Sequence, residues 1–129
     1  MISLLIASIT AIVLAQFSSF LVKSFAAQSP QWKELINTGG FPSSHAAFVS
    51  CVAAGVFILQ GISPLFVVSL ALCLVVLRDA VGVRRQVGFL SREINSMKKK
   101  KVFNESAGHT PLQVAAGVLL GIILAVILV

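Results

Sequence analysis

Four apolar runs divide this chain, and each is long enough to cross a lipid bilayer as a helix. They cover residues 2–22, 44–60, 62–80 and 111–129. A helix rises ~1.5 Å per residue, so a hydrocarbon core of ~30 Å needs about 20 residues, with a lower limit near 17. Only 11% of the residues are charged, against about 25% in soluble domains. The sequence therefore predicts one all-α integral membrane domain, a bundle of about four transmembrane helices.

The connections between these runs predict the topology. The third run begins at Ile62 or Pro64, so only the turn signal Gly61-Ile62-Ser63-Pro64 lies at its junction with the second run, and it forces an antiparallel hairpin. The other two connections are longer and polar, and with four spans they emerge on the same face. They carry the clustered cations: Lys23, Lys33, Arg84, Arg85, Arg92 and Lys98 to Lys101. Because basic loops stay inside, we expect that face to be cytoplasmic and both termini and the Gly61 hairpin to lie outside.

The formal net charge of +6 is consistent with two kinds of partner, nucleic acid and the membrane surface. The cations sit in loops beside apolar spans, so we expect lipid headgroups as the partner and no nucleic acid. Cys51 and Cys73 lie inside apolar runs, where free cysteine packs as a small hydrophobe. Two histidines without a carboxylate cluster or a cysteine pair fall short of a catalytic metal site, and no cofactor is expected.

Two short segments stand where a polar loop gives way to an apolar run. They read Gly39-Gly40-Phe41-Pro42-Ser43-Ser44-His45 and Gly108-His109-Thr110-Pro111-Leu112-Gln113. Ser43 or Ser44 is suited to cap one helix, and Thr110 with Pro111 to start the other. The first N–H groups of a helix are unpaired and carry partial positive charge, so two such starts facing each other form an anion pocket. The glycines allow close backbone approach, and the histidines suggest phosphoryl chemistry.

A third polar segment, Arg78-Asp79-Ala80-Val81-Gly82-Val83-Arg84-Arg85, ends the third apolar run. Ionisable residues at this depth are usually paired, so Asp79 is expected to meet an arginine of this segment or one of the histidines. Arginine presents a planar fork of donors that suits phosphate oxygens. Arg84 and Arg85 are therefore candidates either for phosphate binding or for anchoring the helix at the headgroups.

At these residues the chain resembles the type 2 phosphatidic acid phosphatase and vanadium haloperoxidase superfamily, in particular its small divergent membrane branch. The segment around Ser43, Ser44 and His45 is similar to the superfamily's Pro-Ser-Gly-His motif, and the segment from Gly108 is similar to its His-x-x-x-Asp motif. The resemblance implies that His109 forms a phosphohistidine and that His45 protonates the leaving oxygen. It implies further that Ser44, the neighbouring backbone and cations hold the phosphoryl oxygens, without a metal.

The chain departs from the superfamily pattern at three points. The Lys-x6-Arg-Pro motif is absent, and Phe103 stands where an arginine precedes the nucleophile. Arg84 and Arg85 are the cations available to replace them. Gln113 occupies the position of the acid that orients the nucleophilic histidine. Glutamine can fix a tautomer but cannot stabilise an imidazolium as a carboxylate does, so either Asp79 or Glu105 does so or turnover is weak.

These observations predict a metal-independent membrane phosphatase acting on a lipid phosphate or diphosphate. Phosphatidate, phosphatidylglycerophosphate and polyprenyl phosphates all fit a site at headgroup level. Two alternatives remain open: a membrane protein that binds the anion without catalysis, and a small subunit of a membrane assembly or transporter. The chain's small size favours homo-oligomerisation. The phosphatase hypothesis predicts that the imidazoles of His45 and His109 face each other across a phosphate-sized gap.

Overall fold

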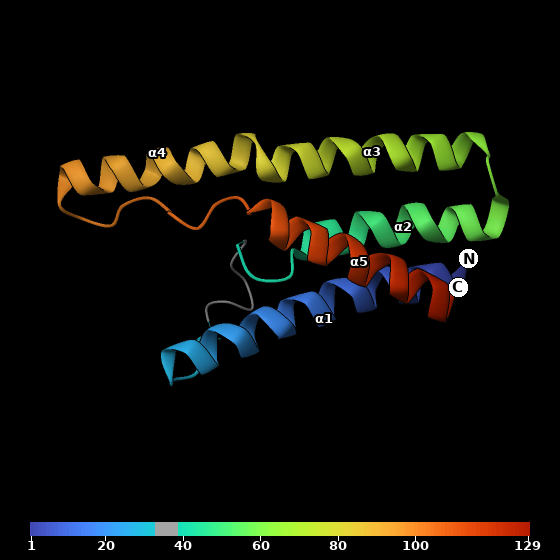
Figure 1. Cartoon of the computed structure of the whole chain (residues 1–129), viewed down its shortest axis with the longest axis horizontal. Helices are drawn as coiled ribbons and strands as arrows, with labels where there is room; N and C mark the ends of the chain where they lie inside the picture. The colour runs from blue at the N-terminus through green and yellow to red at the C-terminus, as the bar shows by residue number, and fades with distance from the viewer. Residues whose placement is uncertain (33–38) are drawn as a thin grey trace.

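The computed structural model describes residues 1–32 and 39–129, so Lys33 lies outside the described residues. The described chain is all-helical, which confirms the predicted fold class (Figure 1). Its helices are α1 (Ile2–Ala27), α2 (Ser44–Gln60), α3 (Pro64–Val81), α4 (Val83–Lys98) and α5 (Pro111–Leu128). Within the described part, α1, α3 and α5 are long and apolar enough to span a membrane, and α2 is an apolar helix of 17 residues.

The helix ends follow local sequence signals. Ser63 caps α3 by accepting a hydrogen bond from the Phe66 N–H at 3.2 Å, and Pro64 takes the first helical position. Gly61, with φ of 64°, turns the chain between α2 and α3. α1 continues to Ala27, beyond the expected end of the first run, and stops at Gln28 in the left-handed region.

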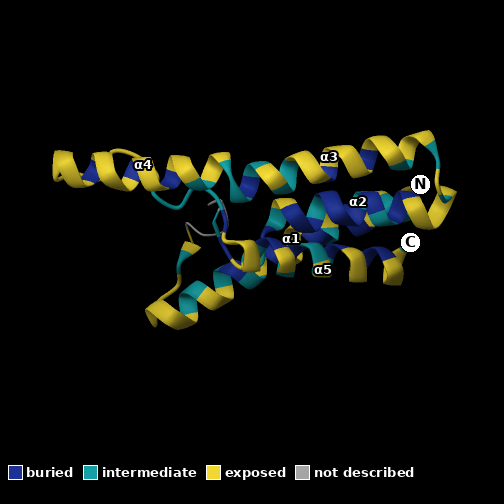
Figure 2. Cartoon of the chain, turned by 45° about the horizontal axis from the view of Figure 1, so that its top comes forward, coloured by how far each residue is buried: buried dark blue, intermediate teal, exposed yellow. Residues whose placement is uncertain are grey.

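α2 is the central helix of the bundle and packs against α1, α3 and α5. Figure 2 shows α2 largely buried, whereas most of α3 is exposed. The closest packing joins α2 to α5: a Cβ at Gly117 would meet the Ser43 carbonyl, and one at Gly121 would meet the Ala47 carbonyl. Small residues let the two backbones approach, as is typical of helix contacts in membranes. This contact brings the starts of α2 and α5 together.

The outer surface of the bundle is apolar, as expected for helices in lipid. On α3, Val68, Leu72 and Val75 are each more than half exposed. Exposed surface of this kind and extent is foreign to a soluble monomer and natural in a bilayer.

Residues 83–98 were expected to belong to a polar loop, and this expectation was wrong, because they form α4. The helix forms because one of its faces, with Gly88, Ser91 and Asn95, is covered by the segment that follows it. Asn95 makes four hydrogen bonds to that segment: its Nδ2 donates to the Phe103 carbonyl and to Glu105, and its Oδ1 accepts from the Val102 and Phe103 N–H groups. Because these hydrogen bonds pair the buried polar groups of α4, the helix can be stable although its sequence is not strongly apolar.

α3 and α4 run end to end, and α4 continues past the end of the bundle (Figure 1). Gly82, with φ of −99° and ψ of −95°, separates them. Both termini and the Gly61 turn lie at one end of the bundle, and the starts of α2 and α5 lie at the other, beside the end of α3 (Figure 1). The alternating direction of the helices therefore brings the polar segments at the starts of α2 and α5 and at the end of α3 to the same end of the bundle.

Candidate functional site

The start of α2 is fixed by Ser43. Its side chain accepts a hydrogen bond from the Ala46 N–H at 3.4 Å, so Ser43, not Ser44, is the N-cap. The Ser43 N–H donates to the Gln113 carbonyl at 3.0 Å, which ties the start of α2 to the first turn of α5. Ser43 is fully buried, Ser44 is partly exposed and His45 is exposed.

His109 is held against the end of α3. Its backbone N–H donates to the Ala80 carbonyl at 3.0 Å. The preceding Gly108 has φ of 84° and packs so tightly on the backbone of Arg84 and Arg85 that a Cβ would overlap it. Only glycine suits both the dihedral and the close approach. The backbone of three segments thus determines where the His109 ring lies.

The start of α5 is a complete capping box. The Thr110 hydroxyl accepts from the Gln113 N–H at 3.3 Å, and Gln113 Oε1 accepts from the Thr110 N–H at 2.7 Å. The two side chains therefore satisfy two otherwise unpaired backbone donors of the helix. This gives Gln113 a structural task besides its position beside the His109 ring.

The His109 side chain is buried, with 5% of its surface exposed, and its Nδ1 has no hydrogen-bond partner among the described residues. Burial lowers the pKa of His109 below its ordinary value, and the positive charges of His45 and Arg84 lower it further. The Gly40 carbonyl and the Gln113 side chain act in the opposite direction. With its pKa lowered, His109 is neutral at pH 7 and retains a nitrogen lone pair.

His45 and His109 line one small cavity together with Val76, Ala80, Arg84 and Gly108. Its volume is about 10 Å³, room for one water and less than a phosphate needs. The expected phosphate-sized gap is therefore smaller than predicted. Arg84 lines this cavity while its Nε donates to the Asp79 carboxylate. Arg84 is thus the partner of Asp79 that the sequence left open.

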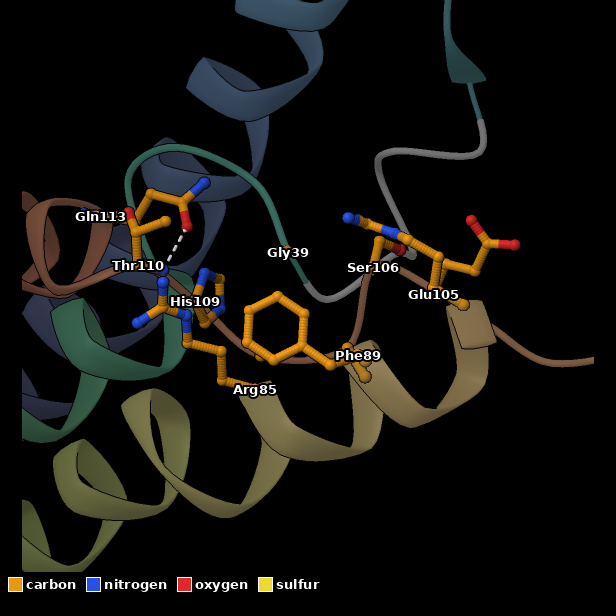
Figure 3. Close-up of a pocket in the computed structure, with 12 residues that line it drawn as sticks. Gly39, Arg85, Phe89, Glu105, Ser106, His109, Thr110 and Gln113 are labelled. Carbon is orange, nitrogen blue, oxygen red and sulfur yellow. Dashed lines mark hydrogen bonds between the residues drawn. The ribbon is translucent and has the colours of Figure 1, made fainter. Parts of the chain in front are cut away.

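A larger pocket of about 210 Å³ opens on the other side of His109 (Figure 3). Its polar lining comes from the α4 face that carries Arg85 and Arg92, from Glu105 and Ser106, and from the start of α5. The Arg85 guanidinium lies 5.4 Å from the centre of the Phe89 ring, which holds it beside the pocket. Figure 3 shows Arg85, His109, Thr110 and Gln113 near one end and Glu105 and Ser106 near the other. His109 is the histidine that borders both spaces.

The residues singled out in the sequence thus fall into three groups. His45, His109, Arg84 and Gly108 surround the small cavity, and Gly39, Arg85, Thr110 and Gln113 line the large pocket with His109 and Gly108. Gly40 packs on Ser19, where a Cβ would collide with the hydroxyl, and its carbonyl acts on His109. Gly40, Ser43, Ser44 and Asp79 form the third group, which lines neither space.

Several contributors were missed in the sequence. They are Phe89, Arg92 and Ser106 in the large pocket, the Ala80 carbonyl and Asn95. The spacing of Gly88, Ser91 and Asn95 on one helical face was a signal that could have revealed α4 and its covering segment. Within residues 1–32 and 39–129, no group of three histidine, cysteine or acidic residues is arranged to hold a metal ion.

Fold and site together define a small all-helical membrane protein in which two histidines meet at the ends of packed helices. Comparison with known families places the chain more closely: the model of the Divergent PAP2 family matches residues 2–124, and the chain belongs to that family. It is 32% identical to the "Uncharacterized membrane protein YuiD" of Bacillus subtilis (strain 168), over 96% of this chain and 92% of that protein. No solved structure matches the chain.

Proposed function

We propose that this protein is a metal-independent phosphatase that hydrolyses a lipid phosphate or diphosphate through a phosphohistidine on His109. The observation that carries the proposal is the cavity shared by His45, His109 and Arg84. Its two histidines come from segments more than sixty residues apart in the chain, His45 and His109, and each stands at the start of a helix. Partial positive charge at these helix starts adds to the attraction for an anion.

In the first step the lone pair of a neutral His109 ring nitrogen attacks phosphorus. The P–N bond forms while the bond from phosphorus to the lipid oxygen breaks, and protonated His45 gives its proton to that oxygen. In the second step water attacks phosphorus, His45 takes a proton from the water, and the P–N bond breaks to release inorganic phosphate. Dividing one difficult displacement into two in this way is the usual benefit of a covalent intermediate.

Charge stabilisation falls to the arginines. Arg84 is about half exposed and bound to a partly exposed carboxylate. Because such an exposed ion pair contributes little stability, Arg84 can exchange Asp79 for a phosphoryl group at a small cost in free energy. As Arg84 swings from Asp79 to the substrate, the small cavity opens toward the size that a phosphoryl group needs. Arg85 and Arg92 lie in the adjoining pocket, where they can meet the remaining oxygens or a second phosphate.

The position of the site supports a lipid substrate. It lies at one end of a bundle whose outer surface is apolar, so a phosphorylated headgroup reaches it while its chains stay in the bilayer. The pocket of about 210 Å³ beside His109 has room for part of a headgroup. Because the clustered cations lie at this end, we assign it to the cytoplasmic side, with both termini outside.

A second candidate, anion binding without turnover, is favoured by one observation. Asp79 pairs with Arg84 and Glu105 accepts from Asn95, so neither carboxylate orients His109 in this conformation. Gln113 in turn is engaged in the capping box. Without a carboxylate partner the His109 ring is less firmly oriented and its positively charged form is less stabilised, so catalysis is weaker.

Phosphate release by the purified protein from a panel of lipid phosphates, with chelator present, tests the proposal. The enzyme predicts turnover that His109→Ala abolishes. His45→Ala should abolish turnover of lipid substrates. With p-nitrophenyl phosphate, whose leaving group needs no proton, it should still give a burst of p-nitrophenol, followed by slow turnover because His45 is also the base of the second step. Arg78→Ala, an exposed arginine outside both cavities, is the matched control and should retain activity. Saturable phosphate or vanadate binding without release of phosphate from any substrate would instead establish the second candidate.

A further inference from the structure

α4 carries an apolar stripe that nothing in the described structure covers. The stripe residues and their exposed fractions are Val83 (65%), Val87 (47%), Leu90 (61%), Ile94 (39%) and Met97 (78%). Among the described helices α4 contacts only α3, which precedes it directly. The segment after α4 covers a different face, the one with Gly88, Ser91 and Asn95.

The spacing of the stripe is that of a coiled-coil seam. Its residues follow one another at intervals of 4, 3, 4 and 3, which is the a/d pattern of a heptad repeat. Val87 and Ile94 then occupy a positions, and Val83, Leu90 and Met97 occupy d positions. β-Branched residues at a with leucine at d favour two parallel helices, and Val87 and Ile94 at a with Leu90 at d match this pattern.

The position of α4 argues against lipid as the cover for most of this stripe. α4 runs on from α3 along nearly the same line and passes the end of the bundle (Figure 1). Its 16 residues reach about 24 Å beyond the membrane-spanning helix. A helix lying flat on the membrane surface would have to bend sharply away from α3, and Figure 1 shows no such bend.

We propose that the stripe on α4 binds the same stripe of a second copy of this chain, forming a parallel two-stranded coiled coil. All copies cross the membrane in one orientation, so α4 helices can meet only in parallel. In this register Glu93 at position g faces Lys98 of the partner subunit at position e, an opposite-charge pair that favours this pairing.

Two further features suit this dimer. α3 lies at the edge of the bundle, packed mainly on α2, so a second α3 can approach it from the lipid. A helix of 16 residues forms a weak coiled coil alone, but confinement of both copies to one membrane raises their effective concentration. The pocket beside His109 uses Arg85, Phe89 and Arg92, which lie off the stripe, and therefore stays open in the dimer.

Site-specific disulfide formation in native membranes tests the interface. Residues at a and d meet their own counterparts across a parallel pair, so Val87→Cys, Leu90→Cys and Ile94→Cys should form dimers on mild oxidation. Arg92→Cys and Ser96→Cys, on other faces of the same helix, are the matched controls and should stay monomeric. The parent chain sets the baseline, because its Cys51 and Cys73 are buried. Equal cross-linking at stripe and control positions, or none at the stripe, would overturn the proposal.

A charge exchange tests the register without disturbing the apolar seam. Glu93→Lys should weaken dimerisation of the full chain in lipid nanodiscs roughly tenfold, and Glu93→Lys combined with Lys98→Glu should restore it. Leu90→Glu with Ile94→Glu should abolish the dimer while helical content and the fold of the bundle are retained. A double charge variant no more dimeric than the single one would contradict the parallel register. Strong quenching of a probe at position 90 by brominated lipid would show that membrane covers the stripe instead.

Discussion

Replacing Asn95 by alanine should release the segment that leads from α4 to His109. The Asn95 side chain is 4% exposed and makes hydrogen bonds of 2.8, 2.8, 2.9 and 3.0 Å to Phe103, Glu105 and Val102. At about 1 kcal/mol net for each bond, the four together contribute about 4 kcal/mol, and water replacing some of them reduces the expected loss to about 2–4 kcal/mol. Because ~1.4 kcal/mol is a factor of ten, local opening should become roughly 30- to 1000-fold more frequent.

Hydrogen exchange measured by mass spectrometry in detergent or nanodiscs reports this opening directly. The amides of Val102 and Phe103 donate to Asn95 Oδ1 and should exchange faster by that factor, while α2 and α5 keep their protection. Ser96→Ala, at the exposed neighbouring position, is the control and should leave exchange unchanged. Unchanged exchange at 102–109 in Asn95→Ala, or an equal rise in the control, would refute the assigned role of Asn95.

Three other outcomes follow from the structure. The pKa of His109 is lowered in the folded chain, so below about pH 6.5 the unfolded chain binds a proton that the folded chain does not. Thermal unfolding should therefore show that stability decreases as the pH is lowered through that window, and decreases less in His109→Gln. Gly121→Ala should destabilise the bundle by about 1–3 kcal/mol, because its Cβ meets α2 backbone, whereas Ala115→Leu on the exposed side of α5 should be near neutral in the same unfolding assay. Arg84→Lys should raise the concentration of vanadate needed for half-saturation about tenfold, since lysine cannot reproduce the guanidinium fork, and an unchanged value would remove Arg84 from the anion site.

Much of the fold was predictable from local signals. Long apolar runs predicted the membrane helices, Gly61 marked the turn, and Ser43 and Thr110 were recognised as candidate caps. These features depend on hydropathy and short-range hydrogen bonds, which the sequence displays directly. α4 was missed because its charged and polar residues lower its hydropathy, although its apolar stripe and its small face both have helical spacing.

The site could be predicted only in part, because its geometry depends on contacts between distant segments. That two histidines stand at helix starts is visible in the sequence. That His109 is tied to the Ala80 carbonyl follows from the helix break at Gly82, which leaves that carbonyl available. The choice of Arg84 as partner of Asp79 depends equally on how α4 leaves α3. Residue types alone do not determine either outcome.

The most direct test of the central claim is to look for the covalent intermediate. The purified protein is mixed with ³²P-labelled lipid phosphate, quenched in alkali, where a phosphohistidine survives, and mapped by mass spectrometry. A phosphohistidine mechanism predicts label on His109, lost on acid treatment and absent from His109→Ala, with slower labelling in His45→Ala. Turnover of substrate with label on another residue, or undiminished turnover in His109→Ala, would contradict it.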